Sequence, residues 1–285
     1  METASEVNAD EPTPMRATMR AVVVEHPGGP EVLQIREPPV PTPSSEEVLI
    51  EVKAFGLNRS ELHFRRGMGE SGSFPRVPGL EATGVVAAAP GGQFTPGTRV
   101  MTLMGGMGRE FDGGYAEYVV VPAAQVIPFT SELPWEQLGA VPLLESVGVD
   151  HVLIDDGEVA GKLRELVPAG VDGAVELVGV NVMRDTLRAV RTGGTVCFTG
   201  MLSDEWTIPE FYPMDWLPNG VRLTAYSGGF ADLPAETLQA FLDAVAAGEA
   251  TIPIGKTYRL GEIVAAHEDM EAGRVGGKGV VVLAD

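Results

Sequence analysis

His63 is the residue whose type points most directly to chemistry in this sequence. An imidazole exchanges a proton near neutral pH, so it can act as a general acid or base on a carbonyl substrate. Glu61 is the nearest carboxylate in sequence and can orient or tune the ring. The alternative interpretations are a solvent-facing loop histidine and a glutamate exposed on a helix face.

The sequence lacks the motifs of several other enzyme classes. It contains no Gly-x-Ser-x-Gly elbow, Walker loop or His-Glu-x-x-His motif, which argues against hydrolase, NTPase and metalloprotease chemistry. The single cysteine, Cys197, and four scattered histidines form no metal-ligand spacing, so we expect neither structural nor catalytic zinc. A Gly-x-Gly-x-x-Gly run at 67–72 precedes Phe74 and Pro75 rather than a helix, so it is interpreted as a flexible loop.

The composition is that of a globular protein with an acidic surface. The 285 residues are 44% hydrophobic, and the formal charge is −20, which would repel nucleic acid phosphates and anionic lipid. Apolar runs such as 279–283 are too short to span a bilayer. The polar residues 1–18 lack the pattern of a secretory signal, so we interpret them as a flexible tail and the protein as cytoplasmic.

Two kinds of secondary structure must position the chemistry. Short apolar runs separated by Gly and Pro predict antiparallel strands from residue 19 to about 142. Beyond that point, strands at 152–154, 174–177 and 196–199 alternate with helices at 162–167 and 183–190, which indicates a parallel α/β sheet. The remaining expected elements are helices around 238–245 and 263–270, the latter ending before Gly273, and a strand at 280–283.

Several sequence runs together resemble the zinc-free quinone oxidoreductase and enoyl reductase branch of the medium-chain dehydrogenase/reductase superfamily. The resemblance implies an α/β protein (α+β overall) with a GroES-like β-rich catalytic domain at 19–142, a Rossmann-like remnant at 143–227, and C-terminal helices and a strand at 228–285 that return partly to the catalytic domain. The runs are Met19–Val23, Ala54–Leu62, Phe74–Val86, Pro96–Val100, Gly113–Pro122, Gly148–Asp155, Arg191–Val196, Ala266–Arg274 and Gly277–Leu283.

The resemblance is interrupted between Pro142 and Leu144. Family members carry there the first Rossmann strand, its glycine-rich turn and helix, and the second strand. A βαβ unit needs roughly thirty residues, and this chain has no such length at that point. The backbone N–H groups that normally hold a dinucleotide pyrophosphate are therefore missing from the sequence.

The resemblance also implies a set of site residues. Asn58 matches the family asparagine at the substrate cleft near the nicotinamide, and His63 replaces a common aromatic residue. Glu81 matches a retained acidic residue and is interpreted as structural. Positions expected to line the remaining cofactor groove, or else to be ordinary strand ends and loops, are Gly179, Gly200, Met201, Leu202 and Lys278.

Three functions remain open. The first is reduction of a quinone or α,β-unsaturated carbonyl with NADPH. The second is a cofactor-independent lyase, isomerase or cyclase that uses the old enolate-stabilising cleft, with Asn58, His63 and Glu61 as its residues. The third is a non-catalytic remnant that binds a small molecule or partner. Because the loss of two strands exposes sheet edges, we also expect a homodimer or higher oligomer that completes the sheet.

Overall fold

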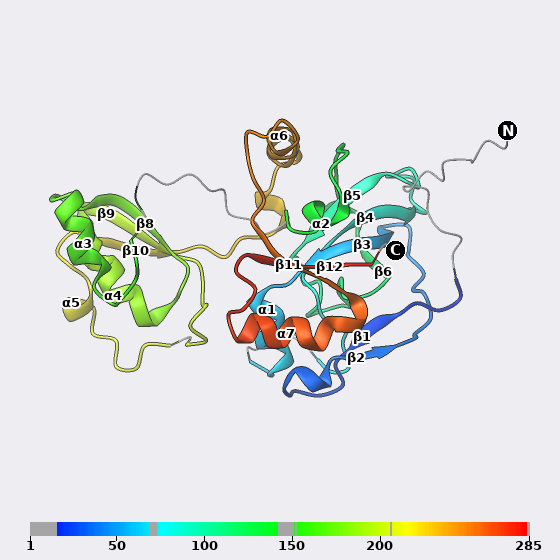
Figure 1. Ribbon diagram of the computed structural model, residues 1–285, viewed down its shortest axis with the longest axis horizontal. Coiled ribbons are helices and arrows are strands. Elements are labelled where there is room, and N and C mark those ends of the chain that lie inside the picture. The colour runs from blue at the N-terminus through cyan, green and yellow to red at the C-terminus, as the bar shows by residue number, and fades with distance from the viewer. Residues whose placement is uncertain (1–15, 69–72, 142–150, 152, 206, 284–285) are drawn as a thin grey trace. The chain divides into compact units, whose positions relative to one another are not determined.

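The chain forms two units, each with its own sheet and apolar core (Figure 1). The computed structural model describes residues 16–68, 73–141, 151, 153–205 and 207–283. The first unit comprises Met1–Val147 and Gly229–Asp285, and the second comprises Gly148–Gly228. The chain therefore leaves the first unit, forms the second, and returns.

The first unit is built on a seven-stranded sheet within the described residues. Its order is β11-β12-β3-β4-β5-β7, with β6 also paired to β3. The β11–β12 pair is parallel, and the other pairs are antiparallel. The strands are β3 (Glu47–Gly56), β4 (Glu81–Ala88), β5 (Arg99–Leu103), β6 (Tyr118–Pro122), β7 (Ile127–Pro128), β11 (Ile254–Arg259) and β12 (Lys278–Val282).

Strand β3 is the hub of this sheet. Along one edge its residues 47–51 pair with β6 and its residues 54–56 pair with β12, while β4 pairs along the other edge. All but the first of its ten residues are buried, as expected for a strand enclosed on both faces. The end of β3 therefore lies between the ends of β4 and β12.

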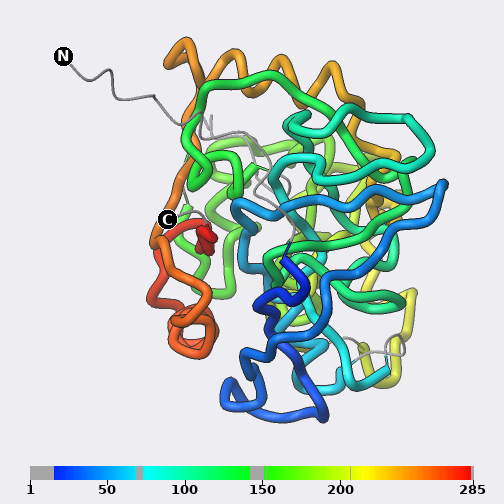
Figure 2. Tube along the Cα trace, turned by 90° about the vertical axis from the view of Figure 1, so that its right-hand side faces the viewer, coloured from blue at the N-terminus to red at the C-terminus, as the bar shows by residue number. Residues whose placement is uncertain are grey.

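Short helices and a two-stranded sheet surround the hub. Strands β1 (Ala21–Val23) and β2 (Gln34–Arg36) pair antiparallel. Helix α6 (Ala235–Ala246) lies along one side of the unit in both views, where Leu238 and Leu242 pack on Met101, Phe129 and Leu138 (Figures 1 and 2). The other helices described in this unit are α1 (Arg59–Arg65), α2 (Trp135–Leu138) and α7 (Ile263–Glu271), with 3-10 turns η1 (Pro30–Val32), η2 (Ala123–Gln125), η3 (Phe230–Asp232) and η4 (Leu260–Glu262).

The second unit is a small parallel α/β structure. Strands β8 (Val171–Glu176), β9 (Val190–Phe198) and β10 (Arg222–Ala225) are parallel in the order β10-β9-β8. The helices are α3 (Val159–Leu166), α4 (Val180–Ala189) and α5 (Pro213–Trp216). Met183 and Leu187 of α4 pack on Val190 and Val196 of β9 to form a modest core.

The architecture confirms the predicted fold class, a mixed α/β protein with an antiparallel β-rich domain and a parallel Rossmann-like domain. The strand predicted at 152–154 is wrong for the residues that the structure describes, because Leu153 and Ile154 are not in a strand. In a complete Rossmann sheet the third strand pairs with the second, which this chain lacks. Without that neighbour, Ile154 is 75% exposed.

A buried polar cluster attaches α7 to the first unit. Arg65 of α1 is fully buried, donates to the carbonyl oxygen of Gly28, and forms an ion pair with Glu271 of α7. On the same helix, Nε2 of His267 lies 3.2 Å from the hydroxyl of Tyr115, and burial lowers the pKa of this histidine to about 3. His267 is thus a neutral core residue.

We predict that Glu271→Ala lowers the free energy of unfolding by about 3 kcal/mol, because it leaves the buried Arg65 guanidinium without its counter-ion. Urea denaturation followed by circular dichroism measures this loss. Glu268→Ala, an exposed residue on the same helix, is the control and should change stability by less than about 0.5 kcal/mol. Equal effects of the two substitutions would contradict a specific role for the ion pair.

Candidate active site

Three predicted residues converge where β3 ends. Antiparallel pairing sets Val280 of β12 opposite Gly56, and the pairing continues as the Leu57 N–H donates to the carbonyl oxygen of Gly279 at 2.8 Å. Asn58 follows at once and precedes α1. This register brings Asn58 beside Lys278, although 220 residues separate them in sequence.

Lys278 joins the other two polar side chains of this cluster. Its Nζ donates to Oδ1 of Asn58 at 2.5 Å and lies 3.1 Å from Oε1 of Glu81. The Glu81 side chain is fully buried, and the Lys278 side chain is 10% exposed. Gly56 makes room for both, because a Cβ at that position would collide with the Glu81 carboxylate and the Lys278 stem. We call Asn58, Glu81 and Lys278 the amide–lysine cluster.

Three buried polar atoms of the amide–lysine cluster have no protein hydrogen-bond partner among the described residues: the donor Nδ2 of Asn58 and both carboxylate oxygens of Glu81. Of these, Oε1 of Glu81 is in the ion pair with Lys278. An unpaired buried polar atom costs about 1–3 kcal/mol, so each favours a polar ligand atom or water. A hollow of about 220 Å³ lies beside Lys278 and is lined by the glycine-rich segment 273–279 together with Leu57 and Met270.

Glu61 uses both of its oxygens to bind backbone N–H groups. Oε2 accepts from Asn58 and Oε1 accepts from Leu80, each at 2.9 Å. Burial raises the pKa of Glu61 from 4.5 to about 7, and the charge of Glu81 adds to this effect. These contacts hold Asn58 at the start of α1, so Glu61 supports the amide–lysine cluster; its predicted catalytic role stays a prediction.

His63 lies within α1 and is 6% exposed. It is therefore neither a loop residue nor solvent-facing. Sequence spacing placed Asn58 and His63 in one short segment, and the structure puts both on the α1 segment at the end of β3. A general acid or base role for His63 remains a prediction.

The predicted groove residues of the second unit gather at the carboxyl ends of its strands. Gly179 begins α4 after β8, and residues 200–202 follow β9. The N–H groups of Gly200 and Leu202 donate to the carbonyl oxygens of Glu176 and Leu177. Gly179, Gly200, Met201 and Leu202 are thus neighbours in one turn region, which is where ligands bind in open α/β sheets.

Two helices of the second unit, α3 and α4, have carboxylates of the chain itself beside their N-termini. Oε1 of Glu176 accepts from the N–H groups of Val178 and Gly179 at 2.7 and 3.0 Å, before α4. At the start of α3, Asp185 accepts from Ala160 at 2.9 Å and Asp156 accepts from Glu158. A helix N-terminus binds phosphate through free N–H groups, so a phosphate would have to compete with these carboxylates for the N–H groups of residues 158, 160, 178 and 179. The Gly-x-Gly-x-x-Gly run lies mostly outside the described residues.

The sequence identified Asn58 and Lys278 separately but not their contact, and it did not identify the hydrogen bonds of Glu176 to the N–H groups just before α4. Pairing between strands that lie far apart in the sequence leaves no local sequence pattern, so this contact could not be predicted. A glutamate just before a turn from a strand to a helix is a local pattern that could have been used.

In the described part of the chain, no group of three His, Cys, Asp or Glu side chains is placed to hold a metal ion. No helix there is long and apolar enough to cross a membrane.

Several similar proteins are named quinone oxidoreductase or enoyl reductase. The chain is 33% identical to a quinone oxidoreductase of Pongo abelii over 182 residues, which covers 62% of this chain and 53% of that protein. It is 31% identical to the Homo sapiens quinone oxidoreductase over the same length and coverage. A trans-enoyl reductase of Aspergillus terreus, tazE, is 34% identical over 138 residues, 45% of each chain. The chain thus matches about half the length of the quinone oxidoreductases.

Solved structures share the fold. The protein AibC superposes with a TM-score of 0.78 at 22% identity and covers 100% of this chain and 99% of its own. A mycobacterial protein solved in complex with NADPH has a TM-score of 0.77 at 23% identity, covering 93% of this chain and 99% of that one.

We predict a pH-dependent contribution of Glu61 to stability. Its pKa of about 7 in the folded state exceeds 4.5, so its contribution is fully present below pH 4.5 and is lost as the pH rises through 7. The loss amounts to about 3 kcal/mol. When the wild type and Glu61→Gln are denatured at pH values between 5 and 8, this loss of unfolding free energy with rising pH should appear in the wild type alone. Parallel pH dependences of the two proteins would contradict it.

Two family models match most of the chain between them. The alcohol dehydrogenase GroES-like domain matches residues 44–131, and the model described as zinc-binding dehydrogenase matches residues 147–281. These matches, the named relatives and the shared fold agree with each other. The chain belongs to the medium-chain dehydrogenase/reductase superfamily, in its zinc-free, quinone oxidoreductase-like branch.

Proposed function

We propose that this chain acts on a quinone or an α,β-unsaturated carbonyl compound, as an oxidoreductase of the kind its relatives are named for. The observation that carries the proposal is the unpaired donor Nδ2 of Asn58 beside the ammonium of Lys278. Donors fixed before the reaction stabilise negative charge as it develops on a substrate oxygen. A carbonyl oxygen placed here satisfies the buried amide and gains from the lysine charge.

NADPH is the reductant that the family resemblance implies, and the mycobacterial structural neighbour was solved with it. When bound, it would supply a hydride. Carboxylates of Glu176, Asp156 and Asp185 already bind N–H groups near the starts of α4 and α3, so the pyrophosphate gains little from those groups. Losing two or three charge-assisted hydrogen bonds, each of about 1.5–3 kcal/mol, weakens a dinucleotide by several powers of ten.

The second candidate is redox-neutral chemistry on the same carbonyl substrate, as a lyase, isomerase or cyclase. The occupied helix N-termini favour it, because the amide–lysine cluster needs no nucleotide to stabilise an enolate. His63 would then be the group that moves the proton. The third possibility is a non-catalytic remnant, which would bind the carbonyl compound through the same contacts but would not convert it.

Titration of the purified protein with NADPH, with and without a quinone or enone, separates these functions. Nicotinamide fluorescence and the melting temperature report binding, and absorbance at 340 nm reports oxidation of NADPH. Oxidation that depends on the enone supports the reductase. Conversion or binding of the enone without NADPH supports the second candidate or the binding remnant, respectively.

We predict that Asn58→Ala lowers kcat/KM for the carbonyl substrate about 10²-fold, the typical effect of losing one donor to a developing oxyanion. The far-UV spectrum should stay unchanged, because Glu61 binds the backbone N–H of residue 58 and not its side chain. Asn219→Ala, at an exposed position, is the matched control and should retain full activity. Unchanged kcat/KM in Asn58→Ala would remove Asn58 from the proposed site.

A further inference from the structure

A second hollow lies in the first unit. Among the described residues, it shares no lining residue with the amide–lysine cluster or with the hollow beside Lys278. Its volume is about 480 Å³, within the range of about 300–1,000 Å³ that is typical of small-molecule sites. Side chains of β1 and β6 and of the segments 38–41, 75–77 and 111–113 line it. We call it the proline pocket, after Pro38, Pro39, Pro41, Pro75 and Pro122 in its lining.

Hydrogen bonds hold the walls of the proline pocket in place. The Met19 N–H donates to the carbonyl oxygen of Pro38 at 2.9 Å, which ties the residues before β1 to the segment 38–41. On another wall, the Val77 N–H donates to Oδ1 of Asp112 at 3.0 Å, and the Gly113 N–H donates to the carbonyl oxygen of Val77 at 2.8 Å. Because these bonds exist without a ligand, little of the wall has to be ordered when a ligand binds.

Most of the lining is apolar. Tyr118, Val120 and Pro122 alternate along β6, so they lie on one face of this strand, and all three line the pocket. Phe111 adds an aromatic ring that packs against the main core of the first unit. The prolines have no backbone N–H to offer a ligand. These walls suit the apolar body of an aromatic compound.

The polar groups of the proline pocket favour a ligand that brings an acceptor. Nε of Arg76 is buried and has no hydrogen-bond partner among the described residues. The terminal nitrogens of Arg76 donate to Oδ1 of Asp112 at 3.3 Å and to Oγ of Ser73 at 3.1 Å. The carboxylate of Glu47 is also bound, because its Oε2 accepts from the Ser44 N–H at 2.9 Å. The unsatisfied group is therefore a donor, which a ligand oxygen would satisfy.

The charges of the lining disfavour an anionic ligand. Among the described residues that line the pocket, Arg76 is positively charged, whereas Glu47 and Asp112 are negatively charged. The formal charge of the whole chain is −20, which also repels an anion at longer range. A neutral group such as a ketone or an ester is therefore the best source of the ligand oxygen.

We propose that the proline pocket binds a neutral aromatic compound that carries a ketone or ester oxygen. Nε of Arg76 donates to that oxygen and fixes its orientation, and the apolar walls cover the rings. The pocket has no residue in common with the amide–lysine cluster, so this binding does not rest on the proposed function.

Titration with prodan, a neutral naphthyl ketone whose emission shifts to the blue in an apolar site, tests the proposal. The full chain is used, so that residues outside the described ranges are present. We expect saturable binding with a dissociation constant on the order of 10 µM and a higher melting temperature. The naphthyl compound with a carboxylate in place of the ketone should bind at least about tenfold more weakly. No saturable binding of prodan, or equal binding of the carboxylate, would overturn the proposal.

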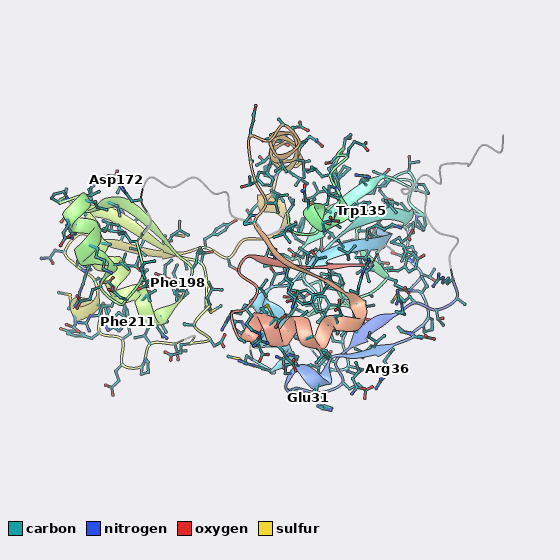
Figure 3. The ribbon with its side chains drawn as sticks, viewed as in Figure 1. Glu31, Arg36, Trp135, Asp172, Phe198 and Phe211 are labelled. Carbon is teal, nitrogen blue, oxygen red and sulfur yellow. The ribbon has the colours of Figure 1, made fainter. Side chains whose placement is uncertain are left out.

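Substitutions locate the binding. Arg76→Met should weaken prodan binding about tenfold, because it removes the charged donor. Arg36→Met is the matched control and should leave binding unchanged, since Arg36 on β2 (Figure 3) has a side chain that is 48% exposed and does not line the pocket. Val120→Trp approaches the pocket independently and should abolish binding, because the indole fills the hollow from β6.

Far-UV circular dichroism and the melting temperature without prodan establish that each variant is folded. Asn58→Ala should bind prodan as the wild type does, whatever its activity on an enone, so failure of the proposed function would leave this result in place. Equal effects of Arg76→Met and Arg36→Met, undiminished binding by folded Val120→Trp, or loss of binding in Asn58→Ala would overturn the proposal.

Discussion

The pairing of β3 on both of its edges is the constraint on which the rest of the first unit depends. Pairing with β4 along one edge and with β12 along the other brings the ends of β3, β4 and β12 together. At that point Gly56 leaves room for side chains from the neighbouring strands. Glu81, Lys278 and Asn58 meet there because of strand register. Glu61 then binds the first turn of α1 to the Leu80 backbone, so the amide–lysine cluster is held by buried hydrogen bonds.

The second unit shows what happens when such pairing is lost. β8 keeps β9 on one side, yet its other edge is free among the described residues, and Ile154 remains outside any strand. The acidic groups Glu176, Asp156 and Asp185 bind N–H groups near the starts of α4 and α3 that could otherwise attract phosphate. In the proposed function, the first unit supplies the carbonyl-binding region and the second unit contributes little to phosphate binding.

Periodicity and turn signals were sufficient to predict most of the elements. The helix marked by Leu238, Phe241 and Leu242 is α6, and the one that ends before Gly273 is α7. The strand expected at 152–154 failed because its sequence pattern survives while its pairing partner does not. Local pattern could not show that Lys278 contacts Asn58, since that contact depends on pairing between β3 and β12. Nor could it show that His63 is buried, because polar residue types give no sign of what packs over them.

We propose that the chain recognises the carbonyl side of its reaction and lacks the phosphate cradle of its relatives. The most direct test compares the dissociation constants of NADPH and reduced nicotinamide mononucleotide, which lacks the pyrophosphate bridge and the adenosine half. We predict values within about tenfold of each other, because Glu176 and Asp185 already bind N–H groups near the starts of α4 and α3. NADPH binding about 10³-fold tighter than the mononucleotide would contradict it.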